Sequence, residues 1–293
     1  MTHDAQPTLS KSPWNHVKLW DGLPAGTEIQ SIEFPRDAAE GDTVLLRFPG
    51  PNPRVAVIAP PVNNTAPVVA RERFTLLWIP VEFSEDSNLI GKVREWIDGP
   101  EPPIPPESRL LTLQGAKIVW APGRAAVIVP RERVSYVRPA VIEFAFYDAE
   151  LRMIEREIAD GWPALETDSP MAFDFNEKSL RRRSELGQRF QRVVSLRARL
   201  SQILPMIHRP PIHPPTLASQ IGDRLRERGR LVERLDFASS QLEVFERVYE
   251  LCGQRASDFS QAHKGHVLEM IIIVLLLGQT LLLLVEMLAA RGT

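Results

Sequence analysis

Arginine is concentrated in one part of this chain, where its density could serve phosphate binding. Residues 178–234 hold 14 Lys or Arg against 4 Asp or Glu, whereas residues 1–177 carry a net charge of −9. A guanidinium group can bind two oxygens of one phosphate at once. The segment therefore predicts a polyanion ligand, which would be RNA (including ribosomal RNA) or anionic lipid headgroups. The alternative is that these arginines pair with the acidic first part of the chain or are solvated. The candidate polyanion-binding residues are Arg181, Arg182, Arg183, Arg224, Arg226, Arg228 and Arg230.

Residue patterns typical of catalysis or metal binding are absent from the sequence. It contains no glycine-rich phosphate loop, no nucleophile elbow and no Cys-x-x-Cys pair, and its single cysteine, Cys252, excludes an intrachain disulfide. His263 and His266 could share one face of a helix, but no further ligand completes a metal set. We therefore expect no cofactor, no metal and no enzymatic activity.

The C-terminal segment Val267–Ala290 is apolar on every side of a helix. It carries no charge from Met270 to Val285, and it reaches the roughly 20 residues that a helix needs to cross the hydrocarbon of a bilayer. The segment therefore predicts a transmembrane helix. Polar groups in such a helix usually contact partners, so Glu269 and Gln279 are candidate intramembrane contacts.

The ends of the chain predict the orientation of this helix. Residues 1–15 show no basic region followed by an apolar one, so we expect no signal peptide. Arg247, Arg255 and Lys264 precede the apolar segment and only Arg291 follows it, which favours an N-terminal bulk in the cytoplasm or its organellar equivalent. The sequence predicts a tail-anchored, single-pass protein of a bacterial or organellar inner membrane.

A head with β-structure is predicted before the arginine-rich segment, after a polar lead at residues 1–20. Pro122–Gly123 suits a type II turn between two strands, and Pro80 predicts an edge position or a bulge for its strand. The head spans residues 21–162. Its predicted strands are the apolar runs Val44–Phe48, Val55–Ala59, Phe74–Phe83, Lys117–Ala121, Ala125–Val129 and Ala140–Tyr147.

An internal similarity within the head predicts two ββα units. The run Arg54–Pro60 resembles Arg124–Pro130, and each is followed by an Arg-Glu-Arg triplet, an apolar run and a short helical pattern that stops at Asp-Gly. The alternative function that we keep open is an enzyme with its active site in this duplicated head. Its candidate acidic residues are Glu82, Glu143 and Asp148.

Residues 163–264 predict a helical hairpin that continues as a coiled-coil stem. A helix is expected from Leu180 to Leu204, followed by a proline-rich connection, an N-cap at Thr216 and a long helix toward the apolar segment. Apolar residues at steps of three and four form a heptad seam, which the first helix, a second copy of the protein, or both would cover. The candidate oligomer seam comprises Leu231, Leu235, Leu242, Phe245 and Tyr249.

Several of these features resemble one known family. The helix start Tyr147–Asp148–Ala149–Glu150, the helical hairpin and stem, and the run Leu268–Glu269–Met270–Ile271–Ile272–Ile273 look like the "required for meiotic nuclear division" family of membrane-anchored proteins. Its members have Trp where Met270 stands and a second Glu where Gln279 stands, and their N-terminal signature strand is not evident in residues 1–140. The resemblance implies an integral membrane, self-associating scaffold, which in mitochondria holds the translation machinery near the inner membrane.

Together these patterns predict an α+β protein with a mixed, β-rich head, a helical-hairpin stem at residues 163–264 and a transmembrane helix at residues 267–290. The expected function is a membrane-anchored, oligomeric scaffold or adaptor that holds its head near the lipid bilayer. An enzyme, or a protein that tethers RNA or ribosomes through the arginine-rich hairpin, is the alternative. The protein partner cannot be inferred from the residues.

Overall fold

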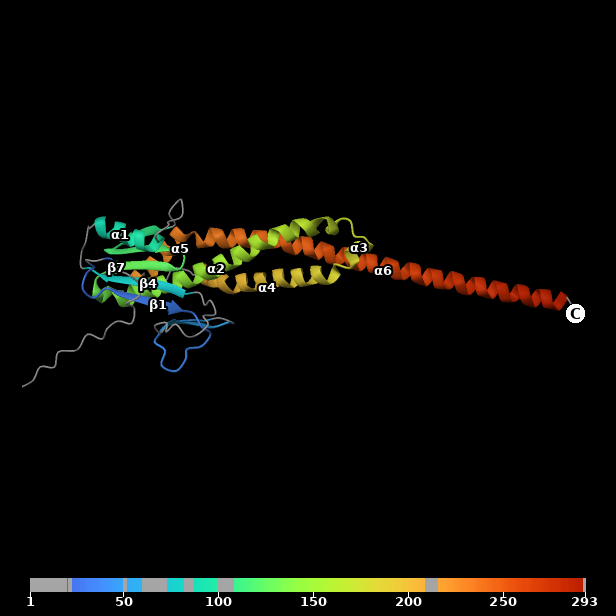
Figure 1. Cartoon of the computed structure of the whole chain (residues 1–293), viewed down its shortest axis with the longest axis horizontal. Coiled ribbons are helices and arrows are strands. Elements are labelled where there is room, and N and C mark those ends of the chain that lie inside the picture. The colour runs from blue at the N-terminus through green and yellow to red at the C-terminus, as the bar shows by residue number, and fades with distance from the viewer. Residues whose placement is uncertain are drawn as a thin grey trace, which may run out of the picture. The chain divides into compact units, whose positions relative to one another are not determined.

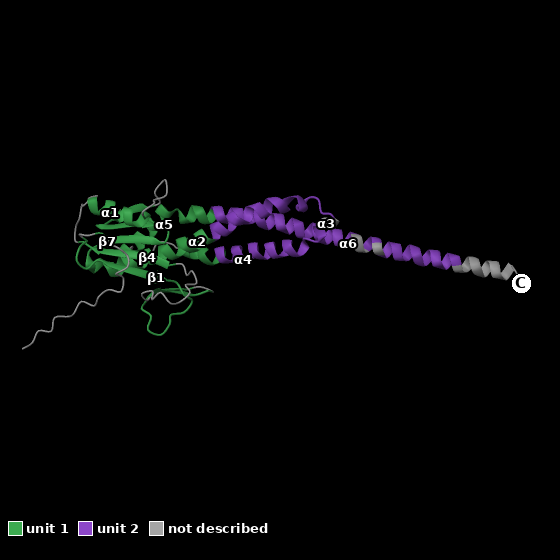
Figure 2. Ribbon diagram, viewed as in Figure 1, with its two compact units in different colours: residues 1–153, 201–236 green, residues 154–200, 237–293 purple. Residues whose placement is uncertain are grey.

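The computed structural model describes residues 20, 23–49, 52–59, 73–81, 87–99, 108–208 and 216–291. Within these ranges, the side chains of residues 177, 178, 263, 264, 267 and 282–291 are not described. The chain divides into two compact units (Figure 2). Unit 1 comprises residues 1–153 and 201–236, and unit 2 comprises residues 154–200 and 237–293, so the long helices α2, α4 and α6 contribute residues to both.

Unit 1 is built on a single mixed sheet of seven strands (Figure 1). The strand order is β2-β3-β1-β4-β7-β6-β5, in which β4 and β7 are parallel and the other neighbours are antiparallel. The strands are β1 (Glu28–Glu33), β2 (Val44–Phe48), β3 (Arg54–Ile58), β4 (Arg73–Pro80), β5 (Arg109–Leu113), β6 (Ala116–Ala121) and β7 (Arg124–Val129).

Five of the six predicted strands are confirmed, with small shifts at their ends. The hairpin at Pro122–Gly123 is confirmed as the β6–β7 connection, and Gly123 has the positive φ of 76° that this turn position requires. The edge prediction for Pro80 was wrong, because β4 pairs with β1 on one side and β7 on the other. The sheet tolerates this proline because it is the last residue of its strand.

Both faces of the central sheet are covered by helices. On one face, helix α1 (Ser87–Asp98) packs Val93 and Ile97 into a core that includes Leu77 and Ile128. On the other face, the ring of Phe144, from helix α2 (Val134–Asp168), meets Trp120 of β6 edge-on, and Phe146 stacks on Phe48 of β2. Burial of these aromatic surfaces accounts for the attachment of α2 to the sheet.

Helix α2 overturns two predictions. Ala140–Tyr147 was predicted as a strand but lies inside α2, as does the acidic run that follows it. The run misleads because Val141, Ile142, Phe144 and Tyr147 are all buried, so no helical alternation is visible in the sequence. The second Arg-Glu-Arg triplet forms the 3-10 turn η1 (Arg131–Arg133) that leads into this helix. The ββα duplication is therefore wrong.

Unit 1 is completed by helix α5 and the start of helix α6. Helix α5 (Leu217–Gly229) begins at the predicted N-cap, where the Thr216 side chain accepts from the Ser219 N–H. Arg230 adopts a left-handed conformation with φ of 54° and ends α5. Helix α6 (Leu231–Arg291) begins at the next residue. Gly229 lies so close to the Phe144 ring that an added Cβ would stand 2.7 Å from it, which explains the glycine at this break.

Unit 2 consists of helical segments from three parts of the chain. They are the end of α2, the helix α4 (Arg183–Ile207) up to residue 200, and α6 from residue 237; η2 (Ser169–Ala172) and α3 (Glu177–Leu180) connect α2 to α4. The Trp162 and Phe245 rings meet edge-on between α2 and α6, and Arg197 of α4 pairs with Glu246 of α6. The end of α2 and helix α4 thus both pack against α6 within the chain.

The heptad seam is buried within the single chain. Leu231, Leu235, Leu242, Phe245 and Tyr249 are all less than 5% exposed. Of the two alternatives for covering this seam, intramolecular packing is therefore favoured over a second copy.

The last part of α6 is helical without a break to Arg291. Over the portion of the chain whose side chains are described, no helix combines the length and the apolar character needed to cross a membrane. The predicted span at residues 267–290 falls partly outside that portion, because the side chains of residue 267 and of residues 282–290 are not described.

Candidate functional site

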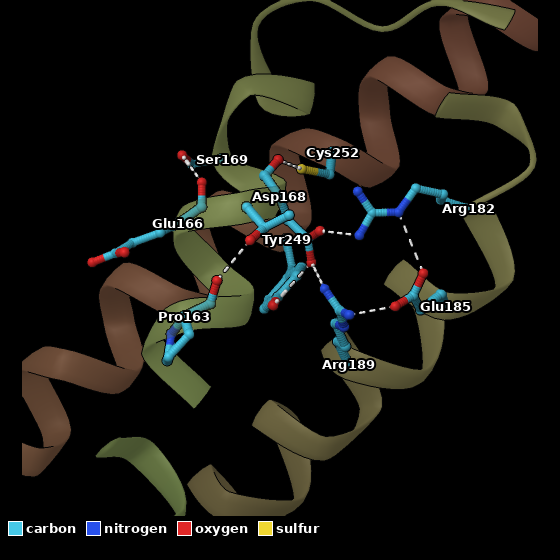
Figure 3. Close-up of polar contacts among 10 residues, drawn as sticks. Pro163, Glu166, Asp168, Ser169, Arg182, Glu185, Arg189, Tyr249 and Cys252 are labelled. Carbon is cyan, nitrogen blue, oxygen red and sulfur yellow. Dashed lines mark hydrogen bonds and ion pairs between the residues drawn. The ribbon is translucent and has the colours of Figure 1, made fainter. Parts of the chain in front are cut away.

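The carboxylate of Asp168 in unit 2 is 0% exposed and is contacted by three other side chains. The Arg182 Nη2 donates to its Oδ1 at 2.7 Å, and Arg189 pairs with its Oδ2. The Tyr249 hydroxyl donates to the same Oδ2 at 3.4 Å. Figure 3 shows these side chains around the carboxylate: Arg182 comes from the turn before α4, Arg189 from α4 and Tyr249 from α6.

Local structure explains how Asp168 comes to be buried there. It is the last residue of α2, and Pro170 at the start of η2 cannot continue the helical hydrogen bonding. The backbone carbonyl of Asp168 accepts from the Cys252 thiol, with 3.7 Å between sulfur and oxygen. Glu185 completes the cluster, because it pairs with both Arg182 and Arg189. The two arginines are thus held between a buried and an exposed carboxylate.

The electrostatics of this cluster favour neutral forms of its two weak acids. Burial and, to a smaller extent, the negative charge of Asp168 together raise the pKa of Tyr249 to about 12. Burial also raises the pKa of the Cys252 thiol, with the same carboxylate contributing. Burial opposes the charge on Arg189, but Asp168 and Glu185 outweigh it, so the pKa of Arg189 is raised. At neutral pH the cluster therefore holds a neutral phenol and a neutral thiol.

These properties suit a structural role for the cluster better than a chemical one. A nucleophilic cysteine needs a lowered pKa and access to solvent, and Cys252 has neither. Both oxygens of Asp168 already accept hydrogen bonds, so neither is available as a general base. We interpret the cluster as a polar clamp that fastens the end of α2 to α4 and α6.

A second buried carboxylate, Asp148, plays a similar part in unit 1. It is 6% exposed and accepts from Arg152 one turn further along α2 at 2.8 Å, and from Arg234 of α6 at 2.6 Å. Asp148 was one of the acidic residues proposed for an enzymatic head. Of the other two, Glu143 lies inside α2, and Glu82 lies outside the described residues.

The predicted polyanion-binding residues are divided between the two units. Arg224 pairs with Glu227 at 2.6 Å, and Arg226 with Asp223, all within α5. Arg230 forms the break between α5 and α6, and Arg228, exposed like Arg230, offers its carbonyl to Arg109.

In unit 2, Arg182 belongs to the clamp, whereas Arg181 and Arg183 are exposed. Nearby, Arg199 of α4 pairs with Glu157 of α2 at 2.6 Å. Internal pairing, the simpler of the two alternatives, thus accounts for much of the arginine-rich segment. Arg181 and Arg183 are left as the exposed pair beside the clamp.

A cavity of about 220 Å³ lies beside the clamp, between α2, α4 and α6. Its walls are mainly apolar, including Val193, Leu196 and Phe245, and Arg192 and Asp160 lie at exposed positions of its lining. Ligand pockets usually reach about 300 Å³ or more. Among the described residues, no group of three or more His, Cys, Asp and Glu is placed to hold a metal ion.

The apolar segment of α6 is exposed over the residues whose side chains are described. All of its described residues from Leu268 to Leu281 are exposed, and they lie on every side of the helix. Gln279 is among the exposed residues, whereas the Thr280 hydroxyl donates to the carbonyls of Leu276 and Leu277. Glu269 pairs with His266 at 3.3 Å, one turn before it. The pairing of Glu269 is therefore local to α6.

Sequence reasoning missed Asp168, and it assigned Tyr249 to the heptad seam and not to this cluster. Asp168 stands 14 residues before Arg182 and 81 before Tyr249, so only the folded chain brings them together. The available signal was Ser169–Pro170 directly after an acidic residue, which marks a helix end.

Comparison with protein-family models, with curated proteins and with solved structures finds no match for this chain. The resemblance to the "required for meiotic nuclear division" family therefore has no support beyond the residues that suggested it.

Proposed function

We propose that the protein is a membrane-anchored scaffold, in which the last part of α6 inserts into a lipid bilayer and holds the folded units at its surface. The observation that carries this proposal is the exposure of apolar side chains around α6. Leu275 and Leu277 are each 64% exposed, and Leu276, on another side of the helix, is 55% exposed. Water-exposed apolar area of this extent costs roughly 25 cal/mol per Å², which insertion into hydrocarbon removes.

The length of the segment is consistent with an anchor when sequence and backbone are considered together. The described apolar residues from Leu268 to Leu281 cover about 20 Å of helix axis, at about 1.5 Å per residue. The helix itself continues to Arg291, and the sequence remains uncharged through Val285. The hydrocarbon of a bilayer is about 30 Å thick, which a helix of that full length covers.

A helical protein partner is the main competing explanation for this surface. A partner helix covers one stripe of residues at steps of three and four, as the buried seam of α6 illustrates between Leu231 and Ala256. The segment from Met270 to Leu277 instead has apolar residues at every position. Lipid surrounds a helix on all sides, so it fits this distribution better than a single partner does.

The folded units supply the scaffold part of the proposal. Unit 1 offers a seven-strand sheet covered by helices, and unit 2 is fastened by ion pairs, of which Arg182 with Asp168 involves a buried carboxylate. The two best-buried carboxylates, Asp148 and Asp168, are both engaged by arginines. These features favour a binding or positioning role for the folded part over an enzymatic one.

The test compares two double variants of the full chain by flotation with liposomes and by extraction of cell membranes at alkaline pH. Ile273→Glu with Leu277→Glu places two charges in the apolar segment and should abolish flotation, because each charge near the bilayer centre costs about 3 kcal/mol. Val194→Glu with Val244→Glu is the matched control, since both valines are exposed on the folded part of unit 2. Equal flotation of both variants, or flotation of a chain that ends at residue 266, would contradict the proposal.

A further inference from the structure

A second membrane contact is suggested by the connection between α2 and α4. This connection contains Phe173, which at 79% is the most exposed of the large hydrophobic side chains described. Two residues later, Phe175 packs against Phe259 of α6, with 6.0 Å between ring centroids. The contact fixes the connection to the same helix that carries the apolar segment, and Figure 2 shows α3 beside α6 in unit 2.

We infer that residues 173–183, named here the rim, dock onto the anionic phosphate headgroups of the bilayer into which α6 inserts. This inference rests on the proposed function. Its chemistry comes from Arg181 and Arg183, which are exposed at the start of α4, and from Phe173. Guanidinium groups bind phosphate oxygens, and an exposed aromatic ring is stabilised at the interface between headgroups and hydrocarbon.

The spacing along α6 places the rim within electrostatic reach of a bilayer. Phe259 precedes Leu268, the first exposed residue of the apolar segment, by nine positions, or about 13 Å of helix axis. Headgroups occupy roughly 5–8 Å of that distance on each side of the hydrocarbon. The remaining separation is about one Debye length at physiological ionic strength, so the arginines experience the surface potential of anionic lipids.

Arg181 and Arg183 of the rim are exposed. Asp168 and Glu185 are engaged by Arg182 and Arg189. Of the two carboxylates within the rim, Asp174 is exposed close to Phe173, and the side chain of Glu177 is not among those described. The clamp therefore has a consequence for the rim. By holding Arg182 and Arg189 inward, it fixes the start of α4 and so the positions of Arg181 and Arg183 on either side of Arg182.

The experiment measures the proximity of the rim to headgroups in the full chain reconstituted into vesicles. An Asp174→Cys variant, in a Cys252→Ser background, carries a fluorophore at the rim, and the vesicles contain a headgroup-attached quencher. The vesicles consist of phosphatidylcholine alone or with 30% phosphatidylglycerol. We expect stronger quenching in the anionic vesicles, and loss of this difference at high salt. Each arginine near an anionic surface should raise the ratio of docked to undocked rim about fivefold.

Arg181→Glu with Arg183→Glu should abolish the difference between the two vesicle types. The matched control is Arg36→Glu with Arg94→Glu, which changes the net charge equally at exposed positions of unit 1 and should preserve it. Equal quenching in both lipids, or an unchanged response of the rim variant, would overturn the inference. A rim variant that loses affinity for RNA while its quenching is unchanged would overturn it as well.

Failure of the anchor itself gives a different result. If α6 does not insert, the labelled chain does not float with either vesicle type, whereas a failed rim leaves flotation intact and removes only the lipid dependence of quenching.

Discussion

Helix α6 contains two stretches with many apolar residues, which differ in the spacing of these residues and in their surroundings. Between Leu231 and Ala256, apolar side chains recur at steps of three and four and are buried by the rest of the chain. Between Leu268 and Leu281 they occupy nearly every position and are exposed. The difference shows that spacing decides what covers an apolar helix: a stripe is covered by neighbouring helices, and a fully apolar surface requires a surrounding apolar solvent.

Polar contacts follow the same division. The buried stretch is accompanied by ion pairs that connect helices, such as Arg197 with Glu246 and Arg234 with Asp148. In the exposed stretch, the polar contacts are local to α6, as in the pairing of His266 with Glu269. Contacts between helices specify one packing arrangement, whereas contacts within one helix do not fix what surrounds it.

The largest effect is expected from placing the same charge in each stretch. Leu242→Asp buries a carboxylate at a position that is 0% exposed and should destabilise unit 2 by more than about 4 kcal/mol, through lost packing and an unpaired buried charge. Leu275→Asp, at a 64% exposed position, should leave thermal unfolding of detergent-solubilised protein nearly unchanged. Circular dichroism during heating measures both, and similar unfolding temperatures for the two variants would contradict the comparison.

Removal of the clamp charge should have the next largest effect. Asp168→Asn keeps the shape of the side chain but leaves Arg182 and Arg189 facing a neutral group, which should cost about 3 kcal/mol of unfolding free energy. Asp174→Asn, at an exposed position six residues further, is the control and should change little. Urea unfolding of the two variants tests this, and a neutral Asp168→Asn would show that the clamp does not stabilise unit 2.

Features that depend on neighbouring residues could be predicted from the sequence better than polar contacts between distant residues. Thr216, the heptad spacing and the Pro122–Gly123 hairpin each depend on a few neighbouring residues, and the structure reproduces them. Strand β1 was missed because Ile29 and Ile32 are its only aliphatic residues, among Glu, Gln and Ser. The clamp was missed for a different reason, since its members are far apart in sequence and no local pattern encodes their meeting.

The ends of helices illustrate a further limit of local reasoning. The helix expected to stop at Leu204–Pro205 continues to Ile207: Pro205 lacks an N–H and so removes one hydrogen bond of the helix, but the His208 N–H still donates to the Leu204 carbonyl at 3.0 Å. The break at Arg230 has no proline and depends on Gly229 meeting Phe144 of another helix. Such a break follows from tertiary packing, which a single sequence does not display.

Alkaline pH should weaken unit 2 through Tyr249. Its pKa is raised to about 12 when folded, so above pH 10 the unfolded chain loses the phenolic proton while the folded chain retains it. Stability is therefore full below pH 10 and falls as the pH rises toward 12. Tyr249→Phe should reduce this slope, as measured by urea unfolding at several pH values. An identical slope in the variant would show that the phenol does not titrate differently in the two states.

The smallest effect concerns the tightness of packing against the buried stretch of α6. An added Cβ at Gly161 of α2 would stand 2.9 Å from the Phe245 ring, whereas an added Cβ at Gly253 of α6 meets nothing within 4 Å. Gly161→Ala should therefore cost about 1 kcal/mol, because overpacking outweighs the gain in helix propensity. Gly253→Ala should instead stabilise by up to about 1 kcal/mol, since only the propensity changes. Opposite shifts of the unfolding midpoint are the expected result. Two stabilising substitutions would mean that the Phe245 ring moves aside easily, and that the buried stretch of α6 is packed more loosely than its burial indicates.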